Sequence, residues 1–143
     1  MKTNLAGRKI VMDAEGLRLK AYLCPAGKLT IGYGHTGDVE AHHVITQHQA
    51  EAILEVDLDR FELGVSKLAP GANTNQFSAM VSLAYNIGLK AFEGSAFLRE
   101  FKAGHLSAAA EQFSRWVRGG GKVLPGLVKR RAAERALFLQ VPS

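Results

Sequence analysis

The chain has 143 residues, of which 47% are hydrophobic and 22% are charged, a balance typical of one globular domain rather than of a disordered or fibrous chain. Its single cysteine excludes an internal disulfide, so folding does not require an oxidising compartment. The formal net charge of +5 favours contact with polyanions such as nucleic acid, anionic membranes or the anionic polymers of a cell wall, without choosing among them.

The first predicted elements are a short helix and a small sheet. Residues 3–14 have a helical spacing of apolar side chains, with Thr3 as the expected cap and Gly16 as the expected stop. Residues 17–35 contain short β-compatible runs on either side of the turn sequence CPAGK. We expect this hairpin to be the only sheet of the chain.

A long helix is predicted next. Thr46 and Gln49 form a capping-box pattern, and apolar residues then recur every three or four positions until Pro70 and Gly71 end the element. A helix of this length can bridge two lobes.

The remainder of the chain reads as four helices. We expect these helices to begin at Asn73 or Thr74, at Ser95, at Ser107 and at Pro125. The helix that begins at Ser107 is expected to end at the glycines at 119–121. The predicted fold class is therefore α+β in a single domain, residues 1–143. It has an N-terminal β lobe at about 15–45, a linking helix at about 46–69 and a C-terminal helical lobe at about 73–140. The aromatic side chains at helical spacings are expected in the core: Phe77, Phe97, Phe101, Phe113 and Trp116.

Three polar side chains near the hairpin are candidates for chemistry. Glu15 lies at the expected C-terminus of the first helix, where the helix dipole disfavours a charged carboxylate and so suits a general acid. Cys24 and Thr30 lie on the two sides of the predicted turn, so if the strands pair, their side chains can come near each other, and both could face Glu15 across a cleft. Taken singly, these residue types more often serve surface, packing or strand roles.

The spacing of these residues resembles the active-site signature of the bacteriophage lysozymes, glycoside hydrolase family 24. Eight residues separate Glu15 from Cys24 and five separate Cys24 from Thr30, within EGLRLKAY and before TIGYGHTG. Later segments are also similar to the family, in the same order: SLAYNIG, FEGSAFL, FSRWVRGGG and GLVKRRAAE. The resemblance covers nearly the whole chain and implies a lysozyme-like fold.

The resemblance also implies roles for individual residues. Glu15 would protonate the glycosidic oxygen, Cys24 would take a position that is aspartate in many members, and Thr30 would position the attacking water. Tyr85 and Ser95 would line the sugar groove. His35 would be structural, and either Arg130 or Arg131 would fix Glu15.

The implied activity is hydrolysis of the bond between N-acetylmuramic acid and N-acetylglucosamine in peptidoglycan, causing lysis of a host cell. Because the chain shows neither a membrane span nor a signal-peptide core, we expect no stable membrane insertion and location in the host cytoplasm until a separate membrane-permeabilising protein releases it. We further expect a monomer without a cofactor.

Cys24 leaves three chemical readings open. It could attack the anomeric carbon as a thiolate, orient a water together with Thr30, or only fill space. We favour water placement, because the threonine suits that task and a good nucleophile would not need it.

Rival functions rest on weaker patterns. The basic stretch from Arg115 to Arg135 could be a solvated helix face, attract an anionic wall or bind nucleic acid, but no nucleic-acid-binding motif accompanies it. A zinc hydrolase would need ligands that the histidines do not offer at the usual spacing, and no protease signature surrounds Cys24. A non-catalytic wall-binding module on the same fold is the main alternative.

Overall fold

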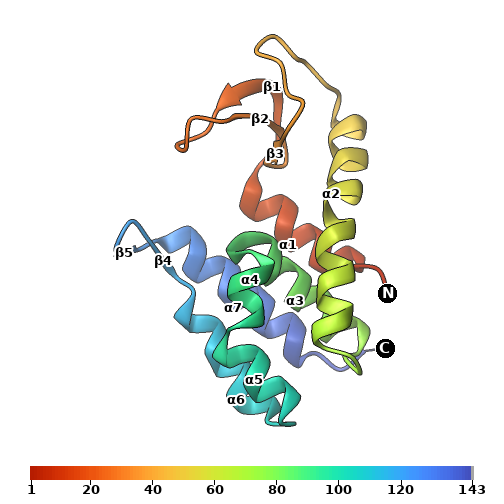
Figure 1. The fold of residues 1–143 in the computed structure, drawn as a ribbon, viewed down its shortest axis with the longest axis vertical. Helices are drawn as coiled ribbons and strands as arrows, with labels where there is room; N and C mark the ends of the chain where they lie inside the picture. The colour runs from red at the N-terminus through yellow and green to blue at the C-terminus, as the bar shows by residue number, and fades with distance from the viewer. Residues whose placement is uncertain (143) are drawn as a thin grey trace.

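The structure is a computed structural model that describes residues 1–142, and it has a small sheet lobe and a larger helical lobe connected by a long helix (Figure 1). The sheet lobe contains β1 (Arg18–Leu23), β2 (Leu29–Gly32) and β3 (His35–Thr36), which pair antiparallel in that order. Tyr22 lies opposite Thr30, and Ile31 lies opposite His35. The predicted hairpin is therefore confirmed.

Helix α1 (Leu5–Glu15) begins at a different cap from the one predicted. The Asn4 side chain accepts a hydrogen bond from the Gly7 backbone N–H at 2.9 Å. The hydroxyl of Thr3 instead donates to Glu62 at 2.7 Å, so the prediction of Thr3 as the cap is wrong. The predicted stop at Gly16 is confirmed, since its φ of 75° turns the chain away from the helix.

Helix α2 (Gln47–Leu68) crosses from the sheet lobe to the helical lobe (Figure 1). The predicted capping box is present: the Thr46 hydroxyl accepts from the Gln49 N–H, and the Gln49 side chain accepts from the Thr46 N–H. One face of the helix is buried along its length, including Ala50, Leu58 and Val65. Both the sheet lobe and the helical lobe pack against α2, so this helix connects the two lobes.

The helical lobe is built around α3 (Thr74–Ile87), which contacts α1, α2 and α7 (Pro125–Leu139). Its residues from Phe77 to Ala84 are all buried, as expected for a helix surrounded by others. Two short helices that the sequence predicted only in part, α4 (Leu89–Glu93) and α5 (Ala96–Lys102), follow α3.

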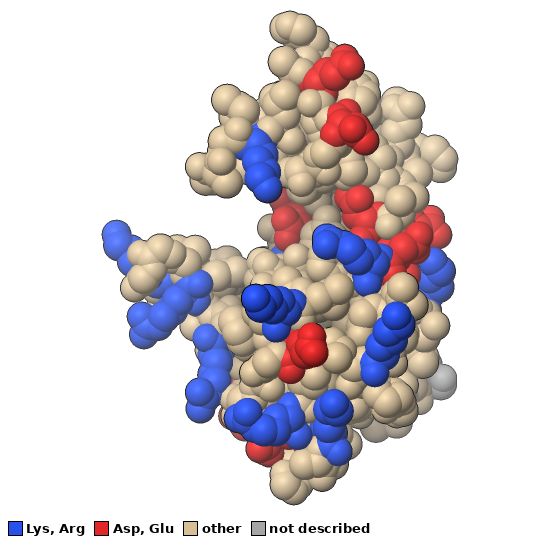
Figure 2. All heavy atoms as spheres, viewed as in Figure 1, with Lys and Arg blue, Asp and Glu red and all other residues tan. Residues whose placement is uncertain are grey.

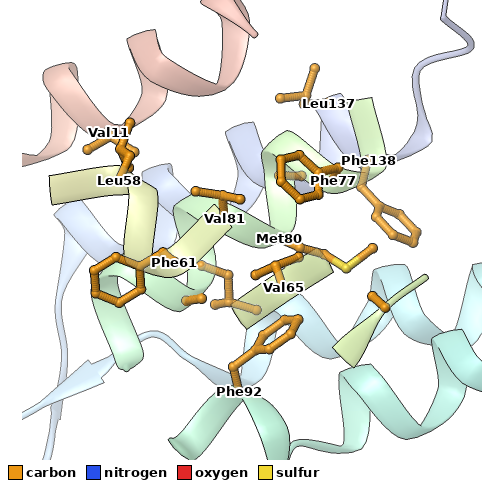
Figure 3. Packing of buried hydrophobic residues seen from close by; sticks show 14 of the residues in the cluster. Val11, Leu58, Phe61, Val65, Phe77, Met80, Val81, Phe92, Leu137 and Phe138 are labelled. Atoms are coloured by element: carbon orange, nitrogen blue, oxygen red, sulfur yellow. The ribbon is translucent and has the colours of Figure 1, made fainter. Parts of the chain in front are cut away.

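Aromatic rings fill the core of this lobe (Figure 3). The centroid of the Phe97 ring lies 4.8 Å from that of Phe113 and 5.3 Å from that of Phe138, in tilted and edge-on arrangements. Phe77 and Phe92 are also buried. The predicted core role is confirmed for Phe77, Phe97 and Phe113, whereas Phe101 and Trp116 are only partly buried against the core.

The segment after Gly104 differs from the prediction, and the expectation of a single sheet in the chain is wrong because this segment contains a second one. Helix α6 (Leu106–Gln112) begins before Ser107, and a 3₁₀ turn at Phe113–Arg115 follows it. The three glycines do not end a helix, because they belong to a second antiparallel hairpin of β4 (Arg118–Gly119) and β5 (Lys122–Val123). Gly120 and Gly121 have φ values of 58° and 78°, a pair of left-handed residues that a tight hairpin turn requires.

The basic stretch is not a continuous exposed face. Arg130 and Arg131 are only 4% and 2% exposed, so the interpretation of this stretch as a solvated helix face is wrong for its two central arginines. Within residues 1–142, no helix is both long enough and apolar enough to cross a bilayer.

Candidate active site

Glu15 is placed by the end of α1 and by the loop between β2 and β3. Its side chain is 24% exposed, and its Oε2 accepts a hydrogen bond from Nη1 of Arg130 at 2.7 Å. A Cβ at position 34 would lie 3.0 Å from the other carboxylate oxygen, and Gly34 has a φ of +85°. The loop therefore passes directly over the carboxylate, and only glycine fits there without strain.

Arg130 is the arginine that contacts Glu15. Its Nη2 donates to the backbone carbonyl of Ser82 at 3.1 Å, and its Nε donates to Glu134 at 3.3 Å. Arg131 points elsewhere, donating to the carbonyl of Trp116 at 3.3 Å. The sequence left the two arginines undecided, and the structure assigns the contact with Glu15 to Arg130.

Glu134 lies behind Arg130 and is fully buried. Its carboxylate accepts from the Ser82 hydroxyl at 2.5 Å and lies 2.7 Å from Nε of Arg131. Burial raises the pKa of Glu134, and the nearby charges of Arg131 and Arg130 act in the opposite direction. These contacts fix the guanidinium of Arg130, so it presents one edge to Glu15.

Cys24 and Thr30 come together at the β1–β2 turn, which confirms that part of the prediction, whereas their facing Glu15 across a cleft stays a prediction. The Cys24 N–H donates to the Lys28 carbonyl at 2.9 Å, and the Thr30 hydroxyl donates to the same carbonyl at 3.0 Å. Hydrogen bonding from the Lys28 backbone, and more weakly from the Thr30 side chain, lowers the pKa of the Cys24 thiol, while partial desolvation opposes this. Thr30 is buried, whereas Cys24 is partly exposed.

Two hollows meet at Glu15. The first hollow has a volume of about 410 Å³ and is lined by residues of α2, of the β2–β3 region and of the end of α3. The second hollow has a volume of about 560 Å³ and lies between α1 and α7. Glu15 and Asn86 line both. Figure 2 shows the surface hollowed between the two lobes, with acidic side chains inside the hollow. Glu15 is therefore accessible from two adjoining hollows, which together are called the groove. Neither Cys24 nor Thr30 lines these two hollows.

Two contacts hold the sheet lobe at the first hollow. Nδ1 of His35 lies 2.7 Å from Oδ2 of Asp57, and the Tyr85 hydroxyl donates to the Tyr33 carbonyl at 3.2 Å. Burial raises the pKa of Tyr85, and the negative charges of Asp57 and Glu15 add to this. His35 therefore joins the hairpin to α2, in agreement with its expected structural role.

The two predicted groove residues lie in different places. Tyr85 lines the first hollow together with Glu15. Ser95 is buried and caps α5, because its hydroxyl accepts from the Leu98 N–H at 3.1 Å and donates to the Phe92 carbonyl at 2.7 Å. Ser95 lines a separate depression together with Trp116.

Sequence reasoning did not single out several residues that line the first hollow. These are Thr36, Asp57, Arg60 and Asn86. Asn86 follows Tyr85 directly, which was a usable signal, but Asp57 and Arg60 lie on the polar side of a helix whose orientation only the fold defines. Among residues 1–142, no group of three His, Cys, Asp or Glu side chains is arranged to hold a metal ion.

Comparison with known proteins decides the family. The family model described as phage lysozyme matches residues 12–134. The chain belongs to the phage lysozyme family. Glu15, Cys24, Thr30, Tyr85 and Arg130 all lie inside the matched range.

Relatives of this chain are named endolysins. One from Salmonella phage P22 is 43% identical, and the match covers 87% of this chain and 89% of that protein. One from Bacillus phage PZA is 49% identical over 96% of this chain but only 55% of its own length. The chain thus spans about half the length of that relative and of the Bacillus phage B103 endolysin, of which it covers 54%.

Solved structures share the fold of this chain. The muramidase domain of SpmX from Asticaccaulis excentricus matches with a TM-score of 0.92 at 36% identity, covering 98% of this chain and 99% of that one. A P22 lysozyme mutant matches with a TM-score of 0.88 at 39% identity over the same shares. The predicted lysozyme-like α+β fold is confirmed.

Proposed function

We propose that this chain is a muramidase that hydrolyses the β-1,4 bond between N-acetylmuramic acid and N-acetylglucosamine in peptidoglycan. The observation that carries the proposal is the position of Glu15, a partly exposed carboxyl group at the junction of two hollows in a chain of the phage lysozyme family. Structural similarity to a protein described as a muramidase domain supports the same reaction.

In this proposal Glu15 is the general acid. When a glycan strand occupies the groove, the Glu15 carboxyl group donates its proton to the glycosidic oxygen as the bond to the anomeric carbon breaks. Arg130 holds the carboxylate in place through its 2.7 Å contact. Thr30 and Cys24 are proposed to position the water that attacks the anomeric carbon, and Tyr85 and Ser95 to contact the sugars.

The test replaces the acid and leaves the shape of the side chain. We expect Glu15→Gln to lower kcat by about 10²–10⁴-fold, the usual contribution of acid catalysis. Clearing of purified peptidoglycan, followed as turbidity, measures the rate. Glu93→Gln is the matched control, since Glu93 is also the last residue of a helix before a glycine but is exposed and lies on α4, outside both hollows. Digestion by Glu15→Gln at the rate of this control would refute the proposal and favour a wall-binding module.

Cys24 is tested by two substitutions. Cys24→Asp should keep much of the activity, because a carboxylate also orients water. Cys24→Ala should lose activity, and a fully active alanine variant would show that the thiol has no chemical part. The configuration of the first product separates the mechanisms: a β-anomer would contradict attack by water from the far face.

The biological role proposed is lysis of a host cell by a monomeric enzyme. Relatives named endolysins support this role. Cells that express the chain should lyse only when their inner membrane is also permeabilised, and lysis without that treatment would contradict the proposed dependence on a separate membrane-permeabilising protein.

A further inference from the structure

The charged side chains in the first hollow are unevenly paired. Three of them line it: Glu15, Asp57 and Arg60. Glu15 is paired with Arg130 at 2.7 Å, and Asp57 is paired with His35 at 2.7 Å. Both carboxylates therefore have a partner within the protein, and the remaining charge is that of Arg60.

Arg60 forms no salt bridge with an Asp or Glu side chain in the described part of the chain. Within residues 1–142, no Asp or Glu oxygen lies within 4.0 Å of its guanidinium. The side chain is exposed, and its Cζ lies 4.5 Å from the centroid of the buried Phe61 ring. Stacking on the ring restricts the guanidinium to the wall of the hollow while its N–H groups stay available, because an arginine that stacks does not use its donors.

Some neutral polar side chains that line the same hollow already have a hydrogen-bond partner, and others do not. The Tyr85 hydroxyl is engaged with the Tyr33 carbonyl. The amide of Asn86 and the hydroxyl of Thr36 have no hydrogen-bond partner among the described side-chain contacts of the chain, and both line the hollow. The unengaged groups are thus a cation, an amide and a hydroxyl, and a carboxylate ligand can accept from all three.

We propose that Arg60 binds a carboxylate carried by a muramic acid residue of the glycan strand, and so makes this hollow selective for anionic over neutral sugar polymers. The carboxylate is supplied either by the lactyl group or by the stem peptide attached to it, and both sources offer the same planar acceptor to a guanidinium. The inference rests on the proposed function, because it names a specificity contact in the same groove.

A purely structural role for Arg60 would be packing on Phe61. The chain provides a matched case, since Cζ of Arg18 lies 4.4 Å from the centroid of the Tyr22 ring, and Arg18 is also exposed. Arg18 lines neither of the two hollows that meet at Glu15. Arg18→Gln therefore removes the same kind of contact without touching the groove.

The experiment compares kcat/KM on three forms of glycan strand: intact strands with stem peptides, strands freed of peptide by an amidase, and freed strands whose lactyl carboxyls have been converted to neutral methylamides. For the parent we expect a preference for the anionic over the amidated strands of about tenfold, the size of one charged hydrogen-bonded contact. Arg60→Gln should lose this preference through a higher KM, Arg60→Lys should keep part of it because its charge remains without the planar fork, and Arg18→Gln should keep all of it.

The outcomes separate the two proposals. Loss of preference on the peptide-free strands assigns the carboxylate to the lactyl group, and loss only on intact strands assigns it to the stem peptide. A parent without preference, or equal preference in Arg60→Gln and Arg18→Gln, overturns the inference. If the parent cleaves no strand, the proposed function fails, and calorimetric binding of soluble anionic and amidated fragments to the parent and to Arg60→Gln still decides the role of Arg60.

Discussion

Gly34→Ala tests whether the β2–β3 loop sets the position of the Glu15 carboxylate. The added Cβ would lie 3.0 Å from a carboxylate oxygen of Glu15, closer than carbon and oxygen normally approach. It would also place a side chain on a residue with φ of +85°. Two separate costs follow, one in the backbone and one at the active site.

The backbone cost has a matched control in Gly104→Ala. Gly104 has a φ of +83°, and a Cβ there meets nothing within 4 Å. Left-handed backbone costs a residue with a Cβ about 1–2 kcal/mol. Since the unfolding entropy of a chain of this size is roughly 0.3 kcal/mol/K, both variants should lose about 3–7 °C in Tm.

The cost at the active site belongs to Gly34→Ala alone. Glu15 has to retreat by a few tenths of an ångström, and because a misplacement of about 1 Å costs roughly 100-fold in rate, we expect a fall in kcat of about tenfold. Calorimetry gives Tm, and turbidity clearing at 25 °C gives the rate while both variants are folded. Equal rates for the two variants would refute the argument that the loop positions Glu15.

Two further predictions concern ionisation. Because hydrogen bonds from the Lys28 backbone and the Thr30 side chain lower the pKa of Cys24, its alkylation by iodoacetamide should rise at a lower pH than that of free cysteine, and a midpoint at or above the free value would contradict the contact. Burial raises the pKa of Tyr85, so above its ordinary value of 10.0 the unfolded chain releases this proton while the folded chain keeps it. The contribution of Tyr85 to the free energy of unfolding is therefore complete below pH 10 and declines above it. Above pH 10 the free energy of unfolding of the parent, relative to that of Tyr85→Phe, should fall by about 1.4 kcal/mol per pH unit, and chemical denaturation measures it.

Local rules in the sequence predicted the elements whose ends are set by nearby residues. The capping box at Thr46, the helix start at Asn73 and the proline at the first turn of α7 all lie where the pattern placed them. Each depends on hydrogen bonds or dihedral preferences within a few residues, so no tertiary information is needed.

The wrong predictions concern residues for which the fold selected a different arrangement, either nearby in the sequence or distant from it. Ser107 is a good cap by type, but α6 begins before it, at Leu106. The glycines at 119–121 were assigned as a helix stop, although two consecutive left-handed residues also make a hairpin turn, and strand pairing between Arg118 and Val123 selects the hairpin. Thr3 had an alternative partner in Glu62, far away in the sequence.

The candidate site was predictable as a spacing but not as a geometry. Arg130 and Arg131 are neighbours of one residue type, and which of them faces Glu15 depends on the rotation of α7 against α1 and α3. The sequence also carried no sign of the role proposed for Arg60, because a charged residue on a long helix is ordinarily solvated.

The proposed acid and the proposed water site belong to different lobes, although Gly34 of the sheet lobe also passes over the Glu15 carboxylate. Glu15 is fixed to the helical lobe, because Arg130 is bonded to Ser82 and Glu134 of that lobe. Cys24 and Thr30 belong to the sheet lobe, whose orientation depends on α2 and on the contacts of His35 with Asp57 and of Tyr33 with Tyr85. The distance between the proposed acid and the proposed water site therefore depends on how the two lobes pack together. Weakening either contact between the hairpin and the helices should lower kcat without altering any group that takes part in the chemistry.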